Sequence, residues 1–126
     1  MKQIYIYTSY FDSVGLIFYK SGRIYKILKE KPDAYFIENL NNSKDQQLIF
    51  KTSKIFNIEN VEWEQAYNVD EFTKTFIAAF IFDSEDKNFE EKKIKLMQKA
   101  DKLIELNIKQ INNKIKKMNE VFNSSI

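Results

Sequence analysis

The carboxylates are the first candidates for chemistry in this chain, because its 126 residues include no histidine and no cysteine. Asp83, Glu85 and Asp86 lie close together in the sequence, but the glycine and the distal glutamate of a calcium loop are missing. Glu62 and Glu64 stand two residues apart, which places them on one face of a strand and could supply the carboxylate pair of a glycoside hydrolase. We interpret both groups as surface carboxylates without a metal or a catalytic role.

Other reaction chemistry is disfavoured by the residue types present. The serines have no histidine to act as their base. Thiol catalysis and most zinc, copper and haem sites need thiolate or imidazole donors, which this chain lacks. Gly15 and Gly22 are isolated, so no glycine-rich loop is available to cradle a phosphate. The sequence therefore predicts a protein without enzymatic activity, cofactor or metal.

Binding through aromatic rings is better supported than catalysis. Aromatic residues make up 15% of the chain, which is enough for both a core and a stacking surface. A small nucleotide could stack on such rings beside a cation. The residues that we consider for ligand stacking or anion contact are Tyr5, Tyr7, Arg23, Tyr25 and Trp63. The alternative is that most of these rings fill the core or cover the sheet.

The formal net charge of +2 conceals an acidic middle segment and a basic end. Residues 61–86 contain seven acidic and one basic side chain, whereas residues 87–126 contain ten basic and five acidic ones. The acidic residues that could form a partner surface, for example by imitating a nucleic-acid backbone, are Glu62, Glu64, Asp70, Glu71, Asp83, Glu85 and Asp86. Alternatively they complement the basic end, in surface pairs worth under about 1 kcal/mol each.

The chain has 19 lysines but a single arginine, Arg23, and its other abundant residues also have AT-rich codons. Codon bias explains the lysines better than selection for phosphate contacts, for which arginine is better suited. The composition indicates an AT-rich bacterium, or a phage or mobile element of one. Because the lysines of the basic end are interleaved with acidic residues, nucleic-acid binding is the weaker interpretation.

The elements that must position these side chains begin with strands. Alternating isoleucine and tyrosine predict a strand over residues 2–8 with both faces covered. Ser21-Gly22 predicts a two-residue hairpin turn between two further strands. The expected strands are 2–8, 14–20, 23–29, 34–38 and 47–56, with a polar loop over 39–45 and a possible sixth strand at 61–67. Residues 1–67 should thus form an antiparallel β-meander of five or six strands.

Two helices are expected after this meander. Asn68 and Glu71 make a capping box, and Tyr67 with Phe72 makes a hydrophobic staple, so the first helix is predicted over 68–83. The second, long helix is predicted over 84–123. We therefore expect a single α+β domain that spans residues 1–126.

The second helix is too long for its own domain. Thirty-six helical residues would extend about 54 Å, whereas a globule of this size is about 36 Å across. Either the helix breaks, near Asn107 or Asn112, or it projects and binds a second surface. Its apolar residues fall at heptad spacings, which favour a homodimer or another partner. The proposed seam is Ile108, Ile111, Ile115, Met118 and Phe122.

These observations favour a non-enzymatic binding protein. We expect a phage or mobile-element inhibitor that contacts a host protein, such as a defence or nucleic-acid-processing complex. The alternatives are sequestration of a small nucleotide on the aromatic sheet and weak nucleic-acid binding through the lysine-rich helix. No export signal and no membrane-spanning run are recognisable, so we expect the protein in the cytoplasm.

Overall fold

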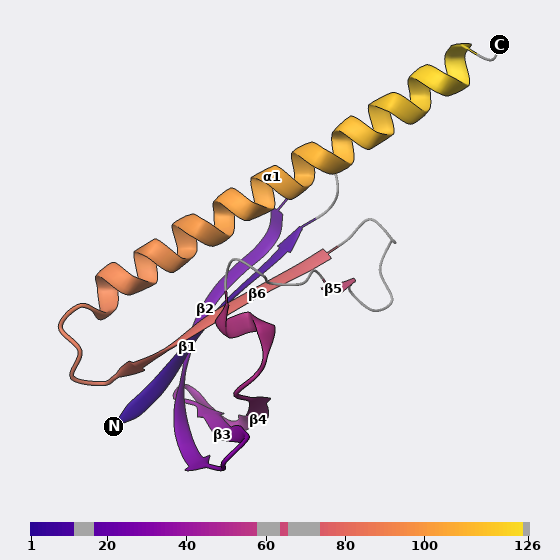
Figure 1. Cartoon of the computed structure of the whole chain (residues 1–126). Coiled ribbons are helices and arrows are strands. Elements are labelled where there is room, and N and C mark those ends of the chain that lie inside the picture. The colour runs from indigo at the N-terminus through magenta and orange to yellow at the C-terminus, as the bar shows by residue number, and fades with distance from the viewer. Residues whose placement is uncertain (12–16, 58–63, 66–73, 125–126) are drawn as a thin grey trace.

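The computed structural model describes residues 1–11, 17–57, 64–65 and 74–124. It contains an antiparallel sheet in the order β4-β3-β2-β1-β6-β5, with one long helix across one face (Figure 1). The elements are β1 (Lys2–Phe11), β2 (Ile17–Glu30), β3 (Ala34–Asn39), β4 (Asn42–Phe50), the 3-10 helix η1 (Lys54–Phe56), β5 (Glu64–Gln65), β6 (Lys74–Asp83) and α1 (Phe89–Ser124). Five strands carry the sheet, because β5 adds only two residues. The predicted α+β class is confirmed, with one C-terminal helix in place of two.

The central strand is β1, whose alternating residues are buried on both faces. Ile4 and Ile6 point to one face, where they pack with residues of β2, β3 and β4. Tyr5 and Tyr7 point to the other face, where they pack beneath α1. β1 also pairs antiparallel with β2 along one edge and with β6 along the other. The period of two therefore indicated this doubly covered strand correctly.

The predicted hairpin at Ser21-Gly22 is wrong, because β2 runs without interruption from Ile17 to Glu30. Gly22 lies within the strand, opposite Tyr7 of β1. A Cβ atom at Gly22 would lie 2.0 Å from the Tyr5 hydroxyl oxygen. The glycine thus makes room for a core tyrosine. A close approach of this kind is a common reason for a glycine inside a strand. The strands predicted over 14–20 and 23–29 belong to this one strand where they are described.

The polar segment predicted as a loop over 39–45 is mostly strand. Only Leu40 and Asn41 form the turn, and β4 begins at Asn42. β4 then pairs with β3 and ends at Phe50, before the short helix η1. The two strands predicted over 34–38 and 47–56 therefore pair with each other, but the second begins and ends earlier than expected. The sixth strand expected at 61–67 is represented by Glu64 and Gln65 of β5, and its other residues lie outside the described part.

The predicted helix over 68–83 is also wrong, because Lys74–Asp83 forms strand β6. Its capping box and staple lie outside the described residues. β6 pairs with the whole length of β1, from Phe11 opposite Lys74 to Lys2 opposite Asp83. An uninterrupted apolar run is typical of a strand that is buried on both faces. The phenylalanines of this segment also fit a helical spacing, but pairing with β1 makes the strand the more stable structure here.

Two hydrophobic clusters hold the fold together, one on each face of the sheet. The cluster beneath α1 contains Tyr5, Tyr7, Phe76, Ala78, Phe82, Leu96, Ala100 and Ile104. The cluster on the other face contains Ile4, Ile6, Tyr25, Tyr35, Ile37, Ile49 and Ala79. Strands β3 and β4 contribute to the second cluster, and Ile55 and Phe56 of η1 pack against it, so the curled end of the sheet and this short helix cover the face opposite α1.

The helix α1 is continuous over 36 residues. Neither Asn107 nor Asn112 breaks it, although asparagine lowers helix propensity. Figure 1 shows that its first half crosses the sheet and that its second half continues beyond the sheet. Of the two possibilities that the sequence left open, the structure shows projection.

We predict that Gly22→Ala destabilises the protein by about 1–3 kcal/mol, because the added methyl group must displace the buried Tyr5 ring. Ser21→Ala, at the neighbouring position of the same strand, should change the free energy of unfolding by less than about 0.5 kcal/mol. Urea unfolding followed by circular dichroism measures both. Equal stability of the Gly22→Ala variant and the wild type would contradict the close-approach role of this glycine.

Candidate protein-binding surface

The first half of α1 is fixed to the sheet by buried apolar side chains. Leu96, Ala100 and Ile104 follow one another at four-residue spacing, so they share one face of the helix. All three are buried in the cluster that contains Tyr5 and Tyr7. Ala100 has no exposed surface, and a side chain this small lets the helix lie close to the strands. This half of α1 is therefore a structural element of the core.

The beginning of α1 is held by a group of aromatic rings. Phe89, its first residue, stacks on Phe82 of β6 with 4.2 Å between ring centroids. The same ring contacts Tyr5 edge-on and Phe80 at a tilt, each with 6.0 Å between centroids. Aromatic pairs of this kind add about 0.5–1.5 kcal/mol beyond the area they bury. They fix the direction in which the helix leaves the turn after β6.

A polar contact marks the middle of α1. The Tyr7 hydroxyl donates a hydrogen bond of 2.7 Å to Asp101, and the Lys20 ammonium donates one of 3.2 Å to the same oxygen. Burial raises the pKa of the Tyr7 hydroxyl, and the hydrogen bond to Asp101 raises it further, so the group remains a donor. Asp101, which interrupts the heptad pattern in the sequence, thus joins α1 to β1 and β2.

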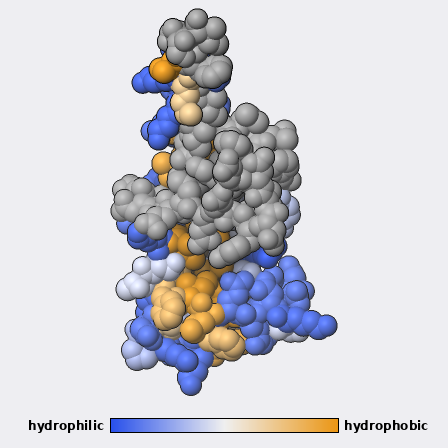
Figure 2. Space-filling model, turned by 90° about the vertical axis from the view of Figure 1, so that its right-hand side faces the viewer, coloured by the Kyte–Doolittle hydropathy of each residue, from blue (hydrophilic) through white to orange (hydrophobic). Residues whose placement is uncertain are grey.

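Beyond Ile108 the helix loses this support. Ile108 is half-buried against the cluster beneath α1. From Lys109 to Glu120, every side chain that the structure describes is exposed, and Met118 is 70% exposed. The end of α1 stands clear of the sheet in Figure 1 and above the rest of the molecule in Figure 2. We call residues 109–124 the helix end.

The proposed seam is thus divided between the two halves. Ile108 belongs to the supported half, and Met118 lies exposed on the helix end. Ile111, Ile115 and Phe122 lie within α1, but their side chains are outside the described part. By their spacing of three and four residues, the seam positions continue the helix face that Ile104 turns toward the sheet. Met118, the member of this face that the structure describes on the helix end, is exposed.

The lysines of α1 also differ between its two halves. Near its start, ion pairs join Lys92 to Asp86, Lys93 to Glu90 and Lys95 to Glu91. Further along, six lysines have no ion pair with any residue that the structure describes. They are Lys99, Lys102, Lys109, Lys114, Lys116 and Lys117. From Lys99 onward, α1 thus carries a cationic surface that the described residues leave uncompensated.

Of the predicted acidic surface, Asp83 ends β6, and Glu85 and Asp86 lie in the turn between β6 and α1. Asp83 accepts the backbone N–H of Glu85, and Asp86 accepts the backbone N–H of Asn88 and the ammonium of Lys92. The hydrogen bond from Glu85 is the main cause that lowers the pKa of Asp83, and the one from Lys92 lowers that of Asp86. These carboxylates shape the turn and the start of the helix. Glu64 lies in β5, and Glu62, Asp70 and Glu71 are outside the described residues.

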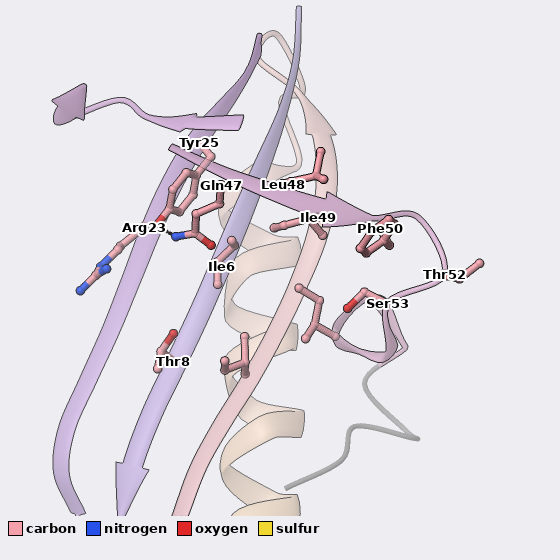
Figure 3. A pocket seen from close by; sticks show the side chains of 12 residues that line it. Ile6, Thr8, Arg23, Tyr25, Gln47, Leu48, Ile49, Phe50, Thr52 and Ser53 are labelled. Carbon is pink, nitrogen blue, oxygen red and sulfur yellow. Dashed lines mark hydrogen bonds between the residues drawn. The ribbon is translucent and has the colours of Figure 1, made fainter. Parts of the chain in front are cut away.

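A hollow of about 490 Å³ lies on the sheet face opposite α1 (Figure 3). Arg23, Tyr25 and Gln47 lie at one end of it, and Ser53 lies at the other. Its lining also includes isoleucines of three elements, Ile6 of β1, Ile49 of β4 and Ile77 of β6. Figure 2 shows a band of hydrophobic side chains between hydrophilic flanks on the side where β4 lies. This hollow is the candidate place for a small ligand.

The rings expected to stack a ligand are largely enclosed. Tyr5 and Tyr7 are buried beneath α1, on the face away from the hollow, and Trp63 lies outside the described residues. Tyr25 lines the hollow but is only 2% exposed, and its hydroxyl donates to Asp45. Arg23 is half-exposed and donates to Tyr19 and Ser21. Of the five residues considered, the structure places Arg23 and Tyr25 along this hollow, and Arg23 and Tyr5 along a second hollow of about 870 Å³ beside the start of α1, without an open ring face in either.

Asp45 organises the polar end of the hollow. It accepts hydrogen bonds from Tyr25 at 2.6 Å, from Gln47 at 2.9 Å and from Asn39 at 3.2 Å. These bonds, led by the one from Gln47, lower the pKa of the Asp45 carboxyl. Asp45, Asp101 and Lys20 belong to no sequence motif that predicts a role for them. Only the break in the heptad pattern at Asp101 could have drawn attention to one of them.

Among the residues that the structure describes, no group of acidic side chains is placed to hold a metal ion. No described helix is long and apolar enough to cross a membrane.

Comparisons with known proteins add no relative. Neither the models of known protein families, nor curated protein sequences, nor solved structures give a match. The candidate surface therefore has to be judged on its own geometry.

We predict that Tyr7→Phe lowers the free energy of unfolding by about 1 kcal/mol, because the half-exposed Asp101 carboxylate loses one donor but keeps Lys20 and water. Tyr19→Phe, which removes an exposed hydroxyl of β2, should cost less than about 0.5 kcal/mol. Urea unfolding of the two variants makes the comparison. If they are equally stable, the Tyr7–Asp101 contact does not anchor the helix.

The pH dependence of the free energy of unfolding should reveal the contribution of Asp45 to stability. Its pKa is lowered in the folded protein, so it contributes stability above the unfolded value of about 3.9, and this contribution is lost as the pH falls through the lowered value. Asp45→Asn should therefore be less stable than the wild type near neutral pH, and the difference should shrink in acid. Urea unfolding at a series of pH values tests this. A difference that stays constant down to the lowest pH would contradict it.

Proposed function

We propose that the chain is a non-enzymatic binding protein that docks on a protein partner through the helix end. The observation that carries this proposal is the exposure of every described side chain from Lys109 to Glu120 on a helix whose apolar face is buried up to Ile104. A helix segment without tertiary contacts is only marginally stable in water. A partner that covers the exposed face would supply those contacts.

The apolar face of the helix end supports protein binding over other roles. Met118 is exposed, and the sequence places Ile111, Ile115 and Phe122 on the same side of the helix. Full burial of such a side chain contributes about 1.5–3 kcal/mol. Helix-in-groove binding and coiled coils both use anchors at this spacing.

The proposed partner is a protein of the host cell. A small chain whose abundant residues have AT-rich codons fits an inhibitor from a phage or mobile element that blocks a host protein by surface contact. The alternative role, sequestration of a small nucleotide, now depends on Arg23 and the two hollows that it lines, because the tyrosine rings beside them are buried. Host-protein binding is therefore the better supported of the two.

Two matched variants test this use of the helix end. Ile111→Asp combined with Ile115→Asp places two charges on the apolar face, and Gln110→Asp combined with Asn113→Asp places the same charges away from it. In a pull-down from the source host, the wild type and the control pair should retain one stoichiometric protein, and the first pair should lose it. Circular dichroism checks that both pairs remain helical. Equal capture by both pairs would contradict docking through this face.

Light scattering over a range of concentrations distinguishes a second copy from another partner. A mass that stays at 15.1 kDa excludes the homodimer predicted from the heptad spacing. A mass that doubles in the wild type, but not in the Ile111→Asp, Ile115→Asp variant, identifies the partner as a second copy.

A further inference from the structure

We infer that the partner surface is an apolar groove bordered by carboxylates, on a protein other than a second copy of this chain. This inference rests on the proposed function and specifies the chemistry of its partner. It follows from the distribution of charge along α1, together with the exposed methionine on its end.

The lysines without ion pairs are the first observation. The helix uses its own acidic residues, and those of the preceding turn, to pair the lysines near its start. Between Lys99 and Glu120 it carries six lysines but only three acidic residues, and one of these, Asp101, already binds Lys20 of β2. From Lys99 onward, α1 thus has an excess of positive charge that nothing described in the structure neutralises.

The second observation is that cationic and apolar groups share the helix end. Lys114 and Met118 are four residues apart, so they are neighbours on one side of the helix. A lysine can lay its apolar stem along a hydrophobic contact while its ammonium reaches a carboxylate at the border. A groove with an apolar floor and an acidic rim satisfies both kinds of side chain at once.

A second copy satisfies them poorly. Residues 109–120 contain four lysines and one glutamate, so a pair of helix ends would bring two positive segments together. Paired helices lie about 8–10 Å apart, which is close to the screening length of about 8 Å at physiological salt. Like charges at that distance destabilise the pair, and the helix end offers little more than two heptads of apolar contact to compensate.

Nucleic acid is also a poorer match. Phosphate contacts would engage the lysines but would leave Met118 in water. The single arginine, which suits phosphate best, lies on β2 rather than on α1. Lys116 and Lys117 are adjacent in sequence and therefore point about 100° apart around the helix, so they cannot both face one strand of phosphates.

Two synthetic heptad peptides serve as probes of this chemistry. Both carry isoleucine at a positions and leucine at d positions, and they differ only in having glutamate or lysine at every e and g position. With fluorescently labelled peptides and full-length protein, anisotropy should show the acidic peptide binding at least about tenfold more tightly than the basic one. Raising the salt from about 0.05 M to 0.5 M should weaken this preference.

Charge-reversal variants provide the matched control. Lys114→Glu combined with Lys117→Glu should abolish or invert the preference, because it reverses two charges of the helix end, including that of Lys114, the neighbour of Met118. Lys29→Glu combined with Lys31→Glu makes the same change in net charge at the exposed end of β2 and should leave the preference unchanged. Loss of the preference in both variants would show that only the net charge matters and would overturn the inference.

The remaining outcomes separate this inference from the proposed function. Equal binding of both peptides, sensitive to Ile111→Asp with Ile115→Asp, overturns the acidic rim but supports docking through the apolar face. Tighter binding of double-stranded DNA or single-stranded RNA than of the acidic peptide overturns the inference in favour of nucleic acid. A concentration-dependent doubling of the 15.1 kDa mass overturns it in favour of a second copy. Binding of neither peptide overturns it as well, and the pull-down then decides whether the helix end docks at all.

Discussion

The strand β1 is paired along both edges and covered on both faces, and the other elements are arranged around it. Its isoleucines require an apolar partner on one face, which β3 and β4 supply by curling over the sheet. Its tyrosines require one on the other face, which the first half of α1 supplies. Because Tyr5 needs the space above Gly22, the neighbouring strand has a glycine where an ordinary side chain would collide. The position of α1 therefore follows from the residues of a single strand.

The contact between Tyr7, Lys20 and Asp101 lies in the last part of α1 that is fixed to the sheet, one turn before the buried Ile104 and two turns before Ile108. On the N-terminal side of Asp101 the apolar face of α1 is buried. There the helix also forms ion pairs between its own residues three or four positions apart. On its C-terminal side the described side chains are exposed beyond Ile108, and the lysines lack partners among the described residues. An aspartate at this position suits a boundary, because a carboxylate that is partly in water can bind a buried hydroxyl without being fully desolvated.

Much of this architecture could be predicted from local patterns, and the errors have a common cause. The alternation around Ile4 and the length of α1 were correctly predicted, since periodicity alone determines them. Gly22 was misinterpreted because a turn and a close approach both favour glycine, and the ring that decides between them is 17 residues away. The run from Phe76 to Phe82 fits both a helix and a buried strand, and only its pairing with β1 distinguishes them. In the candidate site, the exposed end of α1 was predictable from its length, whereas the partners of Asp101 were not, because they lie on distant strands.

The pairing of β1 with β6 also has a consequence for how the chain is made. Gln3 and Phe82 are opposite each other in the sheet, so the first strand to leave the ribosome receives its second neighbour only when most of the chain has been synthesised. Until then the sheet consists of β1 to β4, one edge of its central strand is open, and the tyrosines beneath the future helix face water. Closing so long a loop is slow compared with forming the hairpins. The nascent chain therefore passes through a stage with an unprotected edge and an uncovered aromatic face, which are removed only when β6 and α1 are added.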